Sequence, residues 1–281
     1  MSLREETMSK NFITPAEMAE TMLTVSEKKA NNSFFNMLLL GIMAGIFISI
    51  GGAAATVIWG TTGDVGLAKY LGAAVFPVGI ILVIFAGSEL FTGNNLMTLG
   101  VMNKRITLGA MFKNWSAVYL GNLIGSIFFA WLMYVSELWG HAGELTVIGQ
   151  KAVAIANAKV GHTFMVAFYR AILCNIVVCL AVWMSLAAQT VQGKVLLLWF
   201  PISAFVMSGF EHIVANMFFI PVGIMYGAQV SVGHMVTANF IPVTLGNVVG
   251  GAVIIPLVYH LIYLNGKNTG QNKEASLKRV S

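Results

Sequence analysis

Two short stretches of this 281-residue chain place acidic and polar side chains inside long apolar runs. The stretch SGFEHIVANM at 208–217 puts Glu211 beside His212, and the stretch AGSELFTGNN at 86–95 carries Glu89. An ionisable side chain within an apolar, membrane-like run is costly and by default marks a functional site. Histidine can also give or take a proton near neutral pH. These stretches therefore predict a site for a small titratable solute.

The composition is that of a polytopic membrane protein. The chain is 57% apolar and 10% charged, with a mean hydropathy of +0.80, whereas a soluble domain is about 25% charged. Several apolar stretches exceed the ~20 residues that a helix needs to span a bilayer. The first thirty residues are polar and charged, so we expect no cleavable signal peptide. The pI of about 9.2 reflects lysines and arginines at membrane edges, so we expect no nucleic-acid partner.

The apolar runs predict an all-α fold with six transmembrane helices, of which the second and fifth are broken. Both of these runs are too long for one helix in a ~30 Å hydrocarbon core and too short for two full spans. Polar interruptions at 87–95 and 208–216 explain the excess length as a broken helix, a re-entrant loop and a half-helix. The predicted runs are about 34–59, 68–102, 108–139, 161–190, 195–226 and 236–264.

The two interrupted runs belong to an internal repeat. Glu89 is followed 33 residues later by Asn122 in GNLIG, and Glu211 is followed 36 residues later by Asn247 in GNVVG. We therefore predict two repeats of three helices, over 34–140 and 160–265. An odd number of spans inverts the second copy, and inverted repeats with broken helices are a transporter and channel architecture. The G-x-x-x-G spacing of both motifs also favours close helix packing.

Two polar flanks are expected outside the repeats. Residues 1–33 should form an N-terminal segment with an amphipathic helix over 14–30, which begins at a capping box of Thr14 and Glu17. Residues 266–281 should form a polar tail. Twelve of the sixteen lysines and arginines fall on the side of the termini, three fall on the other side, and Arg170 lies within a span. This asymmetry predicts that both termini are cytoplasmic.

The chemistry is expected where the two breaks meet. Half-helix N-termini carry partial positive charge and free N–H groups, so they attract anions. His212 from one break and Thr92 from the other would face each other, and both can donate a hydrogen bond to a small anion. Glu89 and Glu211 occupy equivalent positions and are expected to accept bonds from N–H groups of the loops or half-helices. Glu211 could also tune His212.

Other classes of function fit the sequence less well. Cys174 and Cys179 lie five residues apart on different helix faces, so we expect no disulfide, and no Cys/His spacing indicates a metal site. The sequence offers no carboxylate beside a nucleophile, so we expect neither an enzyme nor a cofactor. A neutral-solute pore of the glycerol or water type would suit the broken helices, but the paired Asn-Pro-Ala motifs of such pores are absent.

Several of these motifs resemble the formate/nitrite transporter family. They are FTG at 91–93, GFEHIVANM at 209–217, CNIVVCLAVWMS at 174–185 and the two LGN triplets, and the resemblance covers roughly residues 15–265. It implies an aquaporin-like fold, a homopentamer with one pore per protomer, and passage of small monovalent anions such as formate, nitrite or hydrosulfide. It also implies a multi-pass protein of the bacterial inner (plasma) membrane. Hydrosulfide is the favoured substrate, and a proton-coupled anion carrier on the same fold is the alternative.

The resemblance also implies roles for individual residues. His212 matches the central histidine of the family, Thr92 the facing loop threonine, Asn175 a buried asparagine of the fourth span, and Lys159 a lysine in the outer vestibule. Arg170 departs from formate-type members, which tend to be uncharged there, whereas nitrite-type members carry a basic residue. The apolar constrictions match Phe76, Ile80, Leu90 and Phe205, with many formate-type members carrying Leu in place of Ile80.

Overall fold

Six apolar helices long enough to cross a membrane run through residues 12–141 and 143–265, the parts of the chain that the computed structural model describes. The predicted number of spans is confirmed. The second span, Val65–Phe85, consists of α4 (Val65–Val75) and α5 (Val78–Phe85), which meet at Phe76 and Pro77. The other five spans are α3 (Phe34–Thr61), α8 (Leu108–Val135), α10 (Phe164–Ala187), α11 (Val191–Ser208) and the last span, Val232–Leu264.

The last span is irregular. It contains α13 (Val232–Met235), α14 (Ile241–Val248) and α15 (Ile255–Tyr259), joined by π-helical turns at Val236–Phe240 and Val249–Ile254 and followed by a third at His260–Leu264. A π-helical turn leaves carbonyl groups without their usual partner four residues ahead, and such turns often lie at functional sites.

Both predicted breaks are present and have the same backbone geometry. Leu90 (φ −108°, ψ 122°) and His212 (φ −112°, ψ 118°) are extended and immediately precede the half-helices. Gly87 and Gly209, each two residues before the glutamate of its break, are left-handed with φ of 75° and 74°, a conformation that glycine adopts without steric cost. The half-helices are α12 (Ile213–Met225) after the second break and, after the first, α6 (Phe91–Asn94), a 3₁₀ turn (Asn95–Met97) and α7 (Thr98–Met102).

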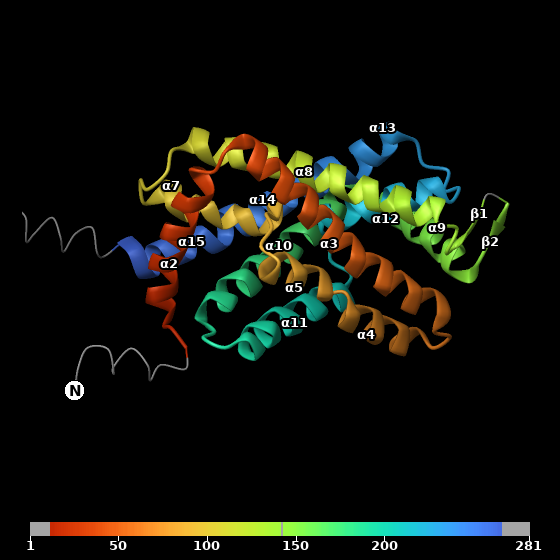
Figure 1. The fold of residues 1–281 in the computed structure, drawn as a ribbon, viewed down its shortest axis with the longest axis horizontal. Coiled ribbons are helices and arrows are strands. Elements are labelled where there is room, and N and C mark those ends of the chain that lie inside the picture. The colour runs from red at the N-terminus through yellow and green to blue at the C-terminus, as the bar shows by residue number, and fades with distance from the viewer. Residues whose placement is uncertain (1–11, 142, 266–281) are drawn as a thin grey trace, which may run out of the picture.

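A short helix precedes the three membrane helices of each repeat. The predicted repeats, 34–140 and 160–265, leave out both short helices apart from Val160. α2 (Pro15–Ala30) starts at the predicted capping box, and α9 (Val147–Val160) starts at Thr146. Both helices end one residue after a lysine, Lys29 or Lys159, and three residues separate each from the next membrane helix. They lie toward opposite ends of the molecule (Figure 1), as an inverted repeat requires. A small hairpin of β1 (Gly140–His141) and β2 (Glu144–Leu145) precedes α9, and the predicted tail at 266–281 lies outside the described residues.

Glycines bring the first and third helices of each repeat into backbone contact. A methyl group at Gly125 would lie 2.0 Å from the Ile42 carbonyl oxygen, and one at Gly250 would lie 2.4 Å from the Ile172 carbonyl oxygen. The packing role predicted for GNLIG and GNVVG is therefore confirmed. It follows that α8 holds Asn122 against α3, and α14 holds Asn247 against α10.

Replacing Gly125 with Ala should destabilise the protein, because the new methyl group cannot fit unless α3 and α8 move apart. Overpacking of this kind costs about 1–3 kcal/mol. The measurement is thermal unfolding of the purified protein in detergent, with Gly63→Ala as the matched control, since nothing lies within 4 Å of a methyl group at Gly63. Equal unfolding temperatures for the two variants would show that this helix crossing is looser than the structure indicates.

Candidate functional site

His212 and Thr92 meet at the centre of the molecule. The Nε2 atom of His212 lies 2.8 Å from the Thr92 hydroxyl oxygen, and both side chains are buried. The Nδ1 atom of His212 accepts a hydrogen bond of 3.1 Å from the backbone N–H of Ala215, so His212 caps the half-helix α12. Because a backbone N–H can only donate, Nδ1 carries no proton in this arrangement. The neutral ring therefore carries its proton on Nε2 and donates it toward Thr92.

Two asparagines fix the backbone of the breaks. The Asn122 side-chain oxygen accepts from the Phe91 N–H at 3.0 Å, and its amide donates to the carbonyls of Gly41 and Glu89. Asn247 repeats this pattern in the second half: its oxygen accepts from the Ile213 N–H at 2.9 Å, and its amide donates to the carbonyls of Glu211 and Ala171. Both asparagines therefore satisfy backbone groups that the breaks leave without helical partners.

Glu89 and Glu211 accept hydrogen bonds from side chains of the half-helices rather than from backbone N–H groups. Each carboxylate accepts from an asparagine amide five residues ahead, Asn94 for Glu89 and Asn216 for Glu211. Each also forms an ion pair with the lysine at the end of the short first helix. Lys29 Nζ lies 2.7 Å from Glu89, and Lys159 Nζ lies 3.0 Å from Glu211. The asparagine amides also donate to Asn114 and Asn239, respectively, both at 2.8 Å.

Lys159 lines the cavity that leads to His212, and its charge is compensated there by Glu211. Its ammonium group donates to both carboxylate oxygens of Glu211, at 3.1 and 3.0 Å, and lies 5.5 Å from the centre of the Phe219 ring. The side chain is 16% exposed. Lys159 therefore serves first to neutralise the buried Glu211 carboxylate.

Asn175 joins the two repeats beside Thr92. Its side-chain amide donates to the Thr92 carbonyl at 3.3 Å, to the Asn95 side-chain oxygen at 2.8 Å and to the Asn247 carbonyl at 2.7 Å. Protein atoms therefore engage both amide hydrogens of Asn175, and one of these contacts holds the Thr92 carbonyl.

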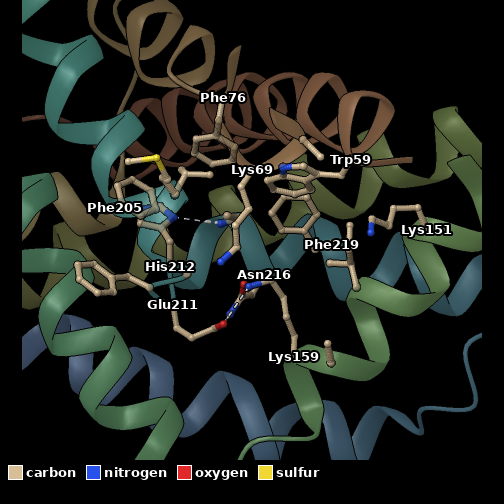
Figure 2. Close-up of a pocket in the computed structure, with 18 of the residues that line it drawn as sticks. Trp59, Lys69, Phe76, Lys151, Lys159, Phe205, Glu211, His212, Asn216 and Phe219 are labelled. Carbon is tan, nitrogen blue, oxygen red and sulfur yellow. Dashed lines mark hydrogen bonds and ion pairs between the residues drawn. The ribbon is translucent and has the colours of Figure 1, made fainter. Parts of the chain in front are cut away.

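A cavity of about 590 Å³ leads to His212, and Trp59, Phe76, Lys159 and Phe205 are among the residues that line it. Figure 2 shows His212 beside Phe205, with Phe76 above them. The rings of Phe76 and Phe205 pack edge to face with centroids 5.9 Å apart, and Phe205 stacks on the His212 imidazole at 5.9 Å. These apolar rings cover the approach to the central histidine.

The other two predicted constriction residues lie away from this cavity. Ile80 and Leu90 are buried in the same hydrophobic cluster as Phe76 and Phe205 but do not line the cavity. Leu90 occupies the position in the first break that His212 occupies in the second. The inverted repeat therefore places an apolar side chain at one half-helix start and a hydrogen-bonding ring at the other.

Comparison with known proteins decides the family. The formate/nitrite transporter model matches residues 16–261. The chain belongs to the formate/nitrite transporter family. It is 42% identical over 274 residues to a probable formate transporter of Methanothermobacter thermautotrophicus, with 92% of this chain and 99% of that protein covered. It is 38% identical over 280 residues to the formate channel FocA of Escherichia coli, with 90% and 95% covered.

Solved structures of the family share this fold. A pentameric formate channel with formate bound aligns with a TM-score of 0.73 and 38% identity, covering 82% of this chain and 98% of that one. An ion channel of the formate/nitrite transporter family aligns with a TM-score of 0.79 and 30% identity, covering 86% and 97%. The chain is therefore a multi-pass membrane protein of a small-anion transporter and channel family, and it is not an enzyme. Among its described residues, no three His, Cys, Asp or Glu side chains form a cluster that could hold a metal ion, and both cysteines are buried and free.

Sequence reasoning missed several residues that the formate/nitrite transporter fold brings to the site. The repeat carries a signal for some of them, since an asparagine follows each glutamate by five residues and another precedes the asparagine of each GN motif by eight. Lys29 could have been found as the repeat counterpart of Lys159. The missed residues are Lys29, Asn94, Asn114, His162, Asn216, Phe219 and Asn239.

Proposed function

We propose that this protein is a channel that passes small monovalent anions past His212 and Thr92. The proposal rests on the position of the His212 Nε2–H group. This group lies between the starts of the two half-helices, at the inner end of a basic cavity. Formate is the first substrate to test, because two relatives are named for formate. Those names do not support the preference for hydrosulfide drawn from the sequence, so hydrosulfide and nitrite become the comparison anions.

The geometry supports a mechanism in which dehydration is the main barrier. Apolar rings at Phe76 and Phe205 exclude hydrated cations and larger solutes, and removing water from a full charge is expensive. The Nε2–H of His212, the Thr92 hydroxyl and the N-terminal ends of α6 and α12 offset part of that cost. The paired carboxylates of Glu89 and Glu211 present no uncompensated negative charge to an anion.

The cap on α12 favours a channel over a proton-coupled carrier. A neutral imidazole can become an acid only if Nδ1 takes up a proton, and Nδ1 is occupied by the Ala215 N–H. Protonation of His212 would therefore cost the protein this cap. We propose that His212 acts as a fixed hydrogen-bond donor in the resting protein and that proton transfer is not required for each passage.

We also propose an oligomeric state and a membrane orientation for this protein, based on its family. One relative of known structure is described as pentameric, so we propose a homopentamer with one pore in each protomer. We also propose an inner-membrane location with both termini in the cytoplasm. The cavity next to Lys159 would then open to the outside.

Flux measurements in proteoliposomes test this function. Formate, nitrite and hydrosulfide are followed in parallel, with empty liposomes as the control and with or without a protonophore. We expect formate to move down its own gradient at a rate that the protonophore does not change. Accumulation against a gradient that collapses with the protonophore would establish a carrier. The absence of flux for all three anions would overturn the proposal.

A further inference from the structure

The cavity in front of His212 is lined by four cationic side chains, of which only Lys159 pairs with a carboxylate among the described residues. Of the described residues that line it, Glu211 alone carries a carboxylate, and Lys159 already neutralises it. Lys69 and Lys151 also line the cavity (Figure 2). The fourth cation of the lining is Arg170, in the second turn of α10.

Arg170 is held by both its backbone and its side chain. Its carbonyl accepts a hydrogen bond of 3.3 Å from the Glu211 N–H, which ties this turn of α10 to the break. Its guanidinium Nη1 donates to His162 Nε2 at 2.8 Å. No carboxylate pairs with Arg170 in the part of the chain that the structure describes. The guanidinium is therefore oriented by a partner that leaves its charge intact.

His162 suits this role because it is a neutral acceptor. It lies between α9 and α10, outside the membrane spans, and partial burial, followed by the nearby charge of Arg170, holds the pKa of His162 below its usual range. At neutral pH the ring is therefore unprotonated and can accept the Arg170 N–H. The remaining N–H groups of the guanidinium form a planar set of donors that matches a carboxylate.

We propose that Arg170, oriented by His162, is an anion-binding site that holds a small monovalent carboxylate in the cavity before it reaches His212. This site rests on the proposed channel function and adds a capture step to it. The cavity of about 590 Å³ is many times the ~30 Å³ share of one water molecule. The anion therefore keeps part of its water while it is bound, and it loses the rest only at Phe76 and Phe205.

The physical alternative is that Arg170 only anchors α10 at the membrane edge. An anchor would affect stability and expression but would not change how flux depends on anion concentration or on salt. A capture site gives the opposite pattern: the half-saturating concentration rises, the maximal flux is retained, and the ionic-strength dependence weakens because a steering charge is lost.

The test compares Arg170→Gln, Arg170→Lys and wild type in proteoliposomes with formate. Arg170→Gln removes a hydrogen bond between a charged donor and formate. We therefore expect its half-saturating concentration to rise about tenfold. Arg170→Lys keeps the charge but loses the planar pair of donors. Its half-saturating concentration should therefore fall between those of wild type and Arg170→Gln. The matched control is Lys194→Gln, which removes one positive charge far from the cavity. Lys194 lies about 21 Å along α11 from Ser208, the end of the helix beside the cavity.

A second measurement separates this proposal from the channel function. The thermal unfolding of detergent-purified wild type is followed with increasing sodium formate, against sodium chloride at equal ionic strength. Formate-specific stabilisation that is lost in Arg170→Gln supports the site, even if wild type conducts nothing and the channel proposal fails. If Arg170→Gln has the same flux kinetics as wild type, the proposed capture site is wrong, whereas the proposed channel function is unaffected. If wild type conducts nothing, the absence of formate-specific stabilisation would overturn the site as well.

Discussion

A Glu211→Gln variant is expected to be less stable than wild type by about 3–5 kcal/mol, the usual cost of removing one partner from a buried ion pair. The substitution keeps the shape of the side chain but leaves the ammonium group of Lys159 without its counter-charge. The side chains of the pair are 4% and 16% exposed, so water replaces the lost partner poorly. Asn216, whose amide donates to the same carboxylate at 2.7 Å, would also lose a charged acceptor.

Denaturation of the purified protein in detergent measures this loss of stability. Two further variants show whether it comes from the ion pair. Glu144→Gln is the matched control, because Glu144 is 83% exposed and its removal should change stability by no more than about 0.5 kcal/mol. The double variant Lys159→Met/Glu211→Gln removes both charges and should recover much of the loss. A Glu211→Gln variant as stable as the Glu144→Gln control would show that Lys159 is not buried in the folded protein.

The positions of the breaks were predictable because they leave a local signal. A polar group inside an apolar run is rare enough that Glu89 and Glu211 mark both breaks, and the spacing to Asn122 and Asn247 reveals the repeat. The facing of His212 and Thr92 follows from the inversion of that repeat. Each of these inferences needs only a short window of sequence or a comparison of two windows.

The partners of the two glutamates were not predictable in the same way. Lys29 lies 60 residues before Glu89, and Lys159 lies 52 residues before Glu211, so no local spacing connects them. The resemblance to the family placed Lys159 in the vestibule, but the ion pair that compensates its charge is not visible in the sequence. The short helix α9 was missed for a related reason, since at 14 residues it is too short to register as a span.

The two halves also show why the site is asymmetric although the fold is not. Both breaks keep the left-handed glycine, the ion-paired glutamate and the asparagine that binds the backbone of the break. The asparagine satisfies backbone groups that must be satisfied in lipid. The residue that starts the half-helix is not bound by that requirement. It is Leu90 in one half and His212 in the other, so the two breaks share a framework and differ at the position that precedes the half-helix.

That difference makes His212→Asn the most informative substitution for flux. Asparagine is among the best helix N-caps, so it can still accept the Ala215 N–H and hold α12 in place. Its side chain is too short to put a donor where Nε2 now meets Thr92. Loss of a donor to a charged solute costs about 1.5–3 kcal/mol, which corresponds to about a 10- to 150-fold slower formate flux. Thermal unfolding should remain close to that of wild type.

His212→Leu supplies the matched comparison, because it gives the second break the residue that the first break already has. It removes the pore donor and the cap together, so we expect the same loss of flux and an added loss of stability of about 1 kcal/mol. Equal flux in wild type and His212→Asn, with the same pH dependence, would contradict the role of Nε2–H. The barrier would then be set by the rings of Phe76 and Phe205 and the ends of the half-helices alone, and His212 would serve only to cap α12.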